Sequence, residues 1–360
     1  MLHHQLDLRD GLDGCGRAAL LGLEQAPRRG GTWSPLHRAL EVALRFKNEA
    51  TWWPWAACEP LYRLAQPWVT RYPLVKGLGN FGSIDGGAPG GPMVVEGHVS
   101  DLARAAFEDV IPRPSRDGLR HYPHDTPLAA RLPFLLLNGS APGAPGPFLL
   151  PPHNLREVAE ALILLTRDVD TPVDDLLDVL LGPDFPTGGE VDAEASDLDG
   201  LYRRGRGTVR LRATVDLVEG PPAALVVTSL PYLVARTPVV RELAARVEDG
   251  EFPGVEGVRD ESAPPDVPVR IVIDLAPGAA DASPGTTLDR LHALTPLAAT
   301  YACTLRPWRS IGHLLRDFLA TRPDAIAAAR DAIKLRDRFG DERRTRIARR
   351  ARDLRAGASS

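Results

Sequence analysis

The spacing of apolar residues predicts a helix in the middle of the chain. Val158, Leu162 and Leu165 recur at helical intervals, so that their side chains share one face. Asn154 precedes this pattern at a position where its side chain can cap the first free amides of a helix. We therefore expect a helix over residues 155–168.

The pattern that follows indicates strands. A strand with one buried face is predicted where apolar and polar residues alternate, at Val209, Leu211, Ala213 and Val215. Two further strands are expected over 224–229 and 269–275, with a helix near 239–247 between them. These segments predict a sheet that is covered on one side by a helix.

Composition narrows the class of protein. At 360 residues with 44% hydrophobic residues, the chain can form two or three domains with sizeable cores. Its net charge of −4 argues against strong DNA binding by the whole chain, because proteins that hold duplex DNA by its phosphates usually carry a basic excess.

Three widely spaced cysteines indicate neither disulfides nor zinc, and neither a signal segment nor a membrane span is visible. A cytoplasmic location is expected, with association to the nucleoid as an option.

Residues 71–100 carry the most specific pattern, RYPLVKGLGNFGSIDG followed by GAPGGPMVVEGHVS. This stretch resembles the DNA-breaking A chains of type IIA DNA topoisomerases, those of gyrase and topoisomerase IV. In that family a tyrosine that attacks the DNA phosphodiester lies eight residues beyond the last glycine, and the same count from Gly86 reaches Val94. Met93 stands where the family has the arginine that assists the tyrosine. Because valine cannot form a phosphotyrosyl bond, no catalytic residue is expected here.

The N-terminal segment LDLRDGLDGCGRAALLGL, residues 7–24, looks like the opening of the family's winged-helix DNA-binding domain. Asp13, Gly16 and Ala18 replace cationic or imidazole side chains of the family, whereas Arg17 keeps its charge. Each lost cation removes a phosphate contact, so Arg17 is the remaining DNA-binding candidate of this segment. Ordinary drift on a solvated helix would account for the same substitutions.

Two tryptophans, Trp53 and Trp55, replace the histidines of the family's HPH motif in the recognition region. An indole has one hydrogen-bond donor and a large apolar face, so it suits an apolar contact better than a phosphate. Burial in the core, a protein-interaction surface and base stacking all remain open for these side chains.

Two other segments bear on DNA binding and on metals. LPFLLLNGSAPGAPGPFLLPPHNL, residues 132–155, resembles the family's NGSSGIAVG region, and Gly143 takes the place of the isoleucine that wedges between base pairs. No wedge is therefore expected.

His121 and His124 have HxxH spacing without a visible third ligand, so no metal site is predicted.

The segment after residue 151 keeps the family's structural motifs, including GPDFPT at 182–187 and a basic strand region at 201–216. In the family this GRG segment touches the DNA arms, which makes its arginines the best surviving phosphate contacts, with a solvated strand as the alternative. These candidates are Arg203, Arg204, Arg206 and Arg210.

The chain ends in a predicted helix over about 311–355, interrupted or bent near Pro323 and Gly340. Its start resembles the first coiled-coil helix of the family, and we expect that the chain stops before the family's return helix and the C-gate that holds two A chains together. The last part of this predicted helix carries a basic face. This face could contact phosphate or an acidic partner, or could form a solvated tail. Its arginines are Arg343, Arg344, Arg346, Arg349, Arg350, Arg352 and Arg355.

Together these features predict an α+β protein with a winged-helix domain (1–150), a tower domain (151–310) and a basic helix (311–360). The leading hypothesis is a catalytically inactive gyrase A-like paralogue that binds DNA weakly or modulates a topoisomerase. The alternatives are an A-type component of an ATP-dependent topoisomerase and a protein-interaction module without DNA binding. Candidate partners are duplex DNA, gyrase A and a gyrase B-like subunit. The chain itself is expected to hold no cofactor, with Mg²⁺ and ATP entering only through a B-type partner, and the missing C-gate leaves dimerisation open.

Overall fold

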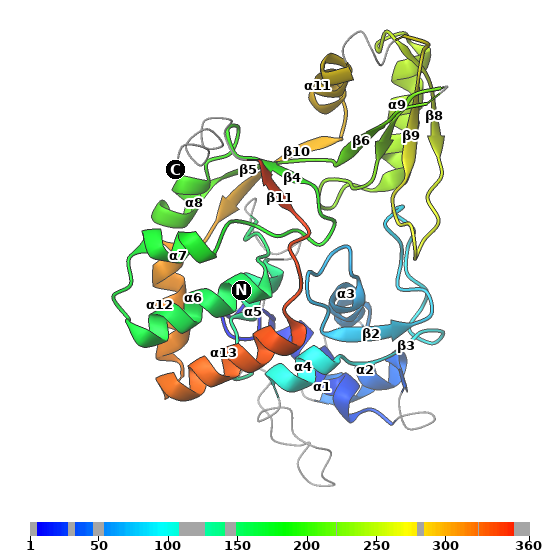
Figure 1. Ribbon diagram of the computed structural model, residues 1–360. Helices are drawn as coiled ribbons and strands as arrows, with labels where there is room; N and C mark the ends of the chain where they lie inside the picture. Colours follow the sequence, from blue (N-terminus) through cyan, green and yellow to red (C-terminus); the bar gives the residue numbers. More distant parts are fainter. Residues whose placement is uncertain are drawn as a thin grey trace.

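Helices and strands are interspersed along the chain, which confirms the predicted α+β class (Figure 1). The computed structural model describes residues 6–27, 33–45, 54–107, 127–140, 149–220, 222–278, 284–322 and 324–348, with the backbone alone at 44–45, 54–58 and 284–286. Within these residues the strands form three sheets, ordered β1-β3-β2, β10-β5-β4-β11 and β6-β7-β9-β8.

The N-terminal part packs helices against the smallest sheet. Helix α1 contacts α2 and α3, and β3 is the central strand, antiparallel to both neighbours. Asp13 caps α1, since its carboxylate accepts a hydrogen bond from the Gly16 amide at 2.7 Å. The elements are α1 (Gly14–Gln25), β1 (Ser34–Pro35), α2 (Leu36–Arg45), α3 (Pro54–Ala65), β2 (Val75–Leu78), β3 (Glu96–Val99), α4 (Asp101–Ala106) and α5 (Phe134–Asn138).

The middle part surrounds the second sheet with helices. Its first helix confirms the prediction for 155–168, with Asn154 as the cap that accepts a hydrogen bond from the Arg156 amide at 3.0 Å. The elements are α6 (Leu155–Arg167), α7 (Val173–Val179), β4 (Glu190–Asp192), α8 (Leu198–Arg204), β5 (Arg206–Arg212), β10 (Ala298–Thr304), α12 (Ile311–Ala320), α13 (Ala325–Phe339) and β11 (Arg346–Ala348).

The outer part is a four-stranded antiparallel sheet with α9 on one face, which stands apart from the rest at the top of Figure 1. The strands expected near 224–229 and 269–275 and the helix expected near 239–247 are all confirmed. The elements are β6 (Val215–Val218), β7 (Ala224–Val227), α9 (Arg236–Glu248), β8 (Val255–Asp260), β9 (Ile271–Leu275) and α11 (Pro284–Leu294).

The apolar residues form two main cores. One is continuous across the N-terminal and middle parts, where Phe134, Leu162 and Leu211 all belong to it. The second lies within the outer part and includes Leu243 of α9 and Ile273 of β9. The first two parts therefore share their hydrophobic stabilisation, whereas the outer part has its own.

The alternating segment near 209–215 buries the predicted face but does not form one strand. Val209 and Leu211 are fully buried in β5, and Ala213 is 4% exposed. The strand ends at Arg212, because the Ala213 amide bonds to the carbonyl of Leu297, and β6 then begins in another sheet. The segment thus connects the middle and outer parts.

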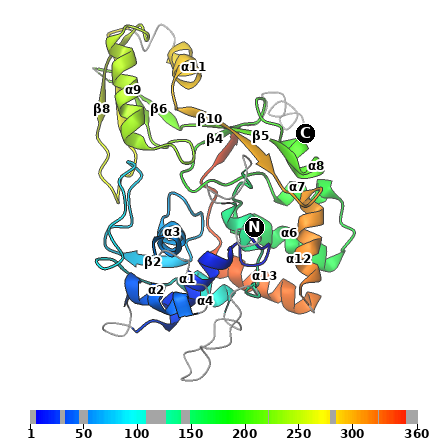
Figure 2. The same ribbon diagram turned by 180° about the vertical axis from the view of Figure 1, so that it is seen from behind.

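The C-terminal helix prediction is correct for α12 and α13 and wrong for residues 341–348, and its last part, 349–355, lies outside the described residues. Helix α13 ends at Phe339, and the chain continues extended until β11 joins the edge of the second sheet, parallel to β4 (Figure 2). Long-range pairing to β4 decides this conformation, which the helical propensity of the local sequence does not indicate.

Helix α1 packs closely against α2 at Gly22. A methyl group at this position would lie 2.3 Å from the Ala39 carbonyl oxygen. We expect Gly22→Ala to lower the free energy of unfolding by about 1–3 kcal/mol, since the helices must move apart. Gly16→Ala is the matched control in the same helix, because its new methyl group would meet neighbours at 3.4 Å or more. Equal urea-denaturation midpoints for the two variants would contradict this packing.

Candidate functional site

The glycine-rich stretch after β2 forms a defined loop. Gly79, Gly82 and Gly86 have φ values of +104°, +93° and +88°, a region that other residues rarely adopt. Asn80 organises the turn: its side-chain oxygen accepts from the Gly82 amide at 2.8 Å, and its carbonyl accepts from the Gly90 amide at 2.9 Å. The glycines therefore serve loop geometry.

Helix α3 of the N-terminal part and helix α9 of the outer part hold this loop in place. The Tyr62 hydroxyl of α3 donates to the Gly90 carbonyl at 2.5 Å. On the other side, Arg236 at the start of α9 forms an ion pair with Asp85 at 2.6 Å. The loop is thus fastened to both the N-terminal and the outer part.

Met93 and Val94 lie at the end of the loop and face solvent. Their exposed fractions are 70% and 75%, whereas the next residue, Val95, is fully buried at the entry to β3. The Val94 amide donates to the Gly91 carbonyl at 3.0 Å, which closes a turn. A side chain at position 94 is therefore presented outward on a held backbone.

The tyrosines of the described residues are all engaged elsewhere. Burial raises the pKa of Tyr72, Tyr202, Tyr232 and Tyr301, and each hydroxyl takes part in a hydrogen bond. Tyr62 is 6% exposed and bonded to the loop. None of these hydroxyls is exposed as a nucleophile, and Tyr122 lies outside the described residues.

Arg203 and Arg204, both predicted DNA contacts, lie on the exposed end of α8 beside carboxylates. Arg203 pairs with Asp174 and, at 2.7 Å, with Asp199. Arg204 also pairs with Asp199 at 2.7 Å. Their charge is largely balanced within the molecule.

The other arginines of the second sheet differ in whether they form ion pairs. Arg210 lies 3.9 Å from Asp192 and donates to the His292 carbonyl at 3.4 Å. Arg206 in β5 and Arg346 in β11 are exposed and form no ion pair with any residue that the structure describes. These two keep an uncompensated charge at the surface.

Arg17 is not at the surface, which corrects the expectation that it contacts DNA. Its side chain is 4% exposed and pairs with the fully buried Asp10 at 2.6 Å. Asp10 also accepts from the Leu128 amide at 2.7 Å. Arg17 therefore joins two segments inside the N-terminal part.

Arg343 is likewise a structural residue, which corrects its assignment to a basic helical face. Its guanidinium pairs with Glu157 at 2.7 Å and donates to the Pro183 carbonyl at 2.5 Å. Arg344 keeps 40% of its side chain exposed and donates to the Pro186 carbonyl at 3.1 Å. Arg349, Arg350, Arg352 and Arg355 lie outside the described residues.

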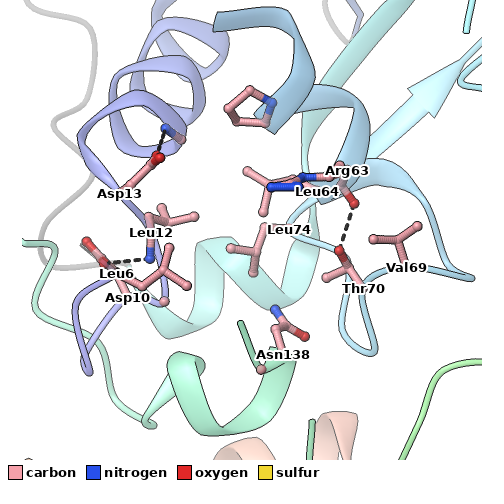
Figure 3. A pocket seen from close by; sticks show the side chains of 14 residues that line it. Leu6, Asp10, Leu12, Asp13, Arg63, Leu64, Val69, Thr70, Leu74 and Asn138 are labelled. Carbon is pink, nitrogen blue, oxygen red and sulfur yellow. Dashed lines mark hydrogen bonds between the residues drawn. The ribbon is translucent and has the colours of Figure 1, made fainter. Parts of the chain in front are cut away.

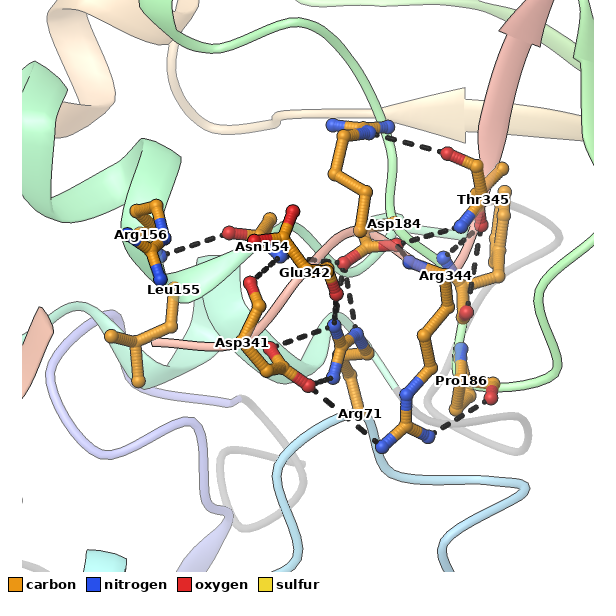
Figure 4. Close-up of polar contacts among 12 residues, drawn as sticks. Arg71, Asn154, Leu155, Arg156, Asp184, Pro186, Asp341, Glu342, Arg344 and Thr345 are labelled. Atoms are coloured by element: carbon orange, nitrogen blue, oxygen red, sulfur yellow. Dashed lines mark hydrogen bonds and ion pairs between the residues drawn. The ribbon is translucent and has the colours of Figure 1, made fainter. Parts of the chain in front are cut away.

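Arg71 is the largest fully buried side chain among the described residues (Figure 4). Its side chain and that of Asp184 are both fully buried and 2.8 Å apart, and Asp341 accepts two further bonds from the guanidinium at 2.8 and 2.9 Å. Residues from the N-terminal part, the middle part and the C-terminal segment meet here. The sequence patterns did not indicate this cluster, although a charged residue beside the apolar run YPLV was a usable signal.

Asp184 is fully satisfied by its neighbours. Besides Arg71, it accepts hydrogen bonds from the Asn154 amide side chain at 3.0 Å and from the backbone amides of Arg344 and Thr345 at 2.8 and 3.0 Å. The GPDFPT motif thus anchors the C-terminal segment. These polar contacts hold β11 against the sheet.

His153 and Tyr202 form a second buried pair. The His153 Nε2 atom lies 2.8 Å from the Tyr202 hydroxyl, and Nδ1 lies 3.3 Å from the Leu136 carbonyl. A carbonyl only accepts, so Nδ1 carries the proton and Nε2 accepts from the tyrosine. Burial lowers the pKa of His153 to about 4, which keeps the ring neutral near pH 7.

A small cavity lies between α1 and α3 (Figure 3). Its volume is about 70 Å³, and its polar lining includes Asp10, Asp13, Thr70 and Asn138. Asp13 and Thr70 already bond to Gly16 and to the Arg63 carbonyl, as the dashed lines show. The space suits a few water molecules rather than a nucleotide.

Trp53, His121, His124 and Gly143 lie outside the described residues, as does the side chain of Trp55. Among the residues that are described, no cluster of His, Cys, Asp and Glu side chains is arranged to hold a metal ion. None of the helices in this part of the chain combines the length and the apolar character that a membrane crossing requires.

Comparison with known proteins agrees with the sequence resemblance. The family model for the A chain of DNA gyrase/topoisomerase IV matches residues 56–330. The DNA gyrase A chain of Lawsonia intracellularis is 35% identical over 69% of this chain and 30% of its own length. The DNA topoisomerase 4 A chain of Synechocystis is 32% identical over 74% and 31%. The DNA gyrase A chain of Kosmotoga olearia is 33% identical over 82% and 36%.

The protein therefore belongs to the family formed by the A chains of DNA gyrase and topoisomerase IV. It spans about a third of the length of the curated relatives it matches. The match includes the glycine-rich loop and the Arg71–Asp184 junction.

Replacement of Arg71 tests the buried junction. We expect Arg71→Met to lower the free energy of unfolding by about 3–5 kcal/mol, because the carboxylate of Asp184 is left buried without a counter-ion. Arg203→Met is the control, since its ion pairs are exposed and its loss should change stability little. Urea denaturation at neutral pH measures both, and a small effect for Arg71→Met would contradict this role.

The neutral state of His153 predicts a pH dependence of stability. Its folded pKa of about 4 is below the unfolded value of 6.5, so on acidification the unfolded chain binds a proton that the folded chain does not. The free energy of unfolding should fall by about 2 kcal/mol more between pH 7 and 5 in the wild type than in His153→Gln. Parallel urea titrations at both pH values check this difference, and identical pH dependence would refute it.

Proposed function

We propose that this chain is a non-cleaving member of the gyrase/topoisomerase IV A family that binds duplex DNA weakly and modulates a topoisomerase or another DNA-associated complex. The observation that carries the proposal is the outward presentation of Met93 and Val94, with 70% and 75% exposure, where the resemblance expects arginine and tyrosine. An apolar side chain cannot attack a phosphodiester. The engaged hydroxyls of the described tyrosines support the same interpretation.

The proposed DNA contacts are the exposed arginines whose charge is not neutralised by any carboxylate that the structure describes. Arg206 and Arg346 are exposed without an ion-pair partner among the described residues, whereas Arg203 and Arg204 face carboxylates. A cation already paired within the protein gains less from a phosphate, because its ion pair must be broken. Two principal contacts predict weak, strongly salt-dependent binding.

Within this proposal the regions keep the roles that the family resemblance implies. Residues 1–150 are the winged-helix domain, and 151–310 are the tower domain. The Arg71 junction and the ion pair of Arg236 with Asp85 support a rigid arrangement of these regions, which DNA binding by separated surface arginines needs. A cytoplasmic location, with the nucleoid as the place of action, belongs to the same proposal.

A second candidate function is supported by the names of the relatives. They are the A chains of gyrase and topoisomerase 4, which favours an A-type component that works with a B-type partner. That partner would supply the ATPase and the Mg²⁺ site, and a nucleophile would have to come from another position than Val94. The two candidates differ in whether a covalent DNA adduct forms.

A trapping experiment distinguishes these functions. The chain is mixed with duplex DNA, Mg²⁺ and a B-type partner protein, and covalent protein–DNA adducts are then measured on denaturing gels. We expect no adduct from the wild type, because residue 94 has no hydroxyl. An adduct from the wild-type chain would refute the non-cleaving function and favour the A-type component.

Electrophoretic retardation of duplex DNA tests the binding. We expect a shift at about 50 mM salt that disappears as salt is raised, and Arg206→Ala should reduce the slope of log affinity against log salt by about one. Arg203→Ala is the control on the neighbouring helix and should have a smaller effect, since its charge is balanced. Absence of any shift at low salt would contradict DNA binding and favour a protein-interaction module.

A further inference from the structure

A concave polar surface lies where α4 meets α13, away from the glycine-rich loop. The two helices are in contact and lie side by side in both views (Figures 1 and 2). The hollow has a volume of about 320 Å³. The charged side chains that line it are Asp101, Arg104, Arg131, Asp331, Lys334 and Arg338.

The two carboxylates of this cavity already have counter-ions. Asp101 is paired with Lys76 at 2.6 Å. Asp331 is paired with Arg322 at 2.7 Å and lies 3.6 Å from Arg131. They therefore contribute little net negative charge to the cavity.

Lys334 and Arg338 supply the positive excess. They are four residues apart in α13, which brings their side chains onto the same face of the helix, and both are exposed. Neither forms an ion pair with a residue that the structure describes. The Arg338 guanidinium lies 4.9 Å from the centre of the Phe339 ring, a contact that limits its orientation without neutralising its charge.

Arg104 adds hydrogen-bond donors to the same cavity. Its Nε donates to the Val99 carbonyl at 3.2 Å, and its Nη2 donates to Glu24 at 3.0 Å. A guanidinium has five N–H donors, and these bonds fix its position while using only part of that set. The cavity thus combines a held guanidinium with two uncompensated cations.

We propose that this cavity binds a small phosphate-bearing anion, specifically the diphosphate group of a free ligand. Two adjacent cations with an additional guanidinium match an anion that carries several charges and many acceptor oxygens better than a single carboxylate. The volume is in the range of small-molecule sites. The walls come from two helices that belong to a continuous core, so the site is preformed.

Titration calorimetry of the full chain with inorganic pyrophosphate at low salt tests the proposal. We expect binding that becomes weaker by about tenfold or more in the double variant Lys334→Ala/Arg338→Ala, because both uncompensated charges are removed. Arg241→Ala is the matched control, since Arg241 is also an exposed helical arginine, in α9. It should bind pyrophosphate like the wild type, and thermal melting of each variant checks that it is folded.

A second titration with a nucleoside diphosphate in the absence of Mg²⁺ identifies the source of the diphosphate. Tighter binding than pyrophosphate supports a nucleotide as the ligand, and equal binding supports a site for the diphosphate alone. Absence of pyrophosphate binding to the wild type, or equal binding to a folded double variant, would overturn the proposal. Loss of duplex retardation in the double variant without any pyrophosphate binding would also overturn it and assign both side chains to a DNA surface.

Discussion

The buried ion pair between Arg71 and Asp184 is the interaction on which the arrangement of the molecule depends. Both side chains are excluded from solvent, and a buried charge without its partner is strongly destabilising. Asp341 completes the coordination of Arg71 and draws the C-terminal segment into the junction. Because three distant segments meet at one guanidinium, the N-terminal part, the middle part and β11 are held in one arrangement.

This junction also gives the family's motifs a structural role that does not depend on DNA cleavage. Arg71, Asn154 and Asp184 belong to three separate motifs, and the structure brings them together through direct hydrogen bonds. Their role here is to hold the scaffold, which does not require a nucleophile at position 94. The proposed loss of cleavage is therefore compatible with strong retention of these motifs, since the two depend on different residues.

The charge of the surface depends on pairing rather than on the number of arginines. Arg17 and Arg343 are bound to buried carboxylates, and Arg203 faces exposed ones. Arg206 keeps its charge available, as do Lys334 and Arg338 on α13. A basic segment in a sequence therefore overstates the potential for phosphate binding wherever carboxylates from other segments lie beside it.

The sequence by itself determined the α+β class, the helix that begins after Asn154 and the buried face of β5, because caps and apolar periodicity act over a few residues. The motifs around Arg71 and Asp184 also sufficed to indicate the family. Only the tertiary structure decided that Arg17 and Arg343 are internal and that residues 346–348 form a strand. Arg343 and β11 depend on partners more than a hundred residues away, and Asp10, the partner of Arg17, is itself held by the amide of Leu128. Local patterns do not encode the position of such distant partners.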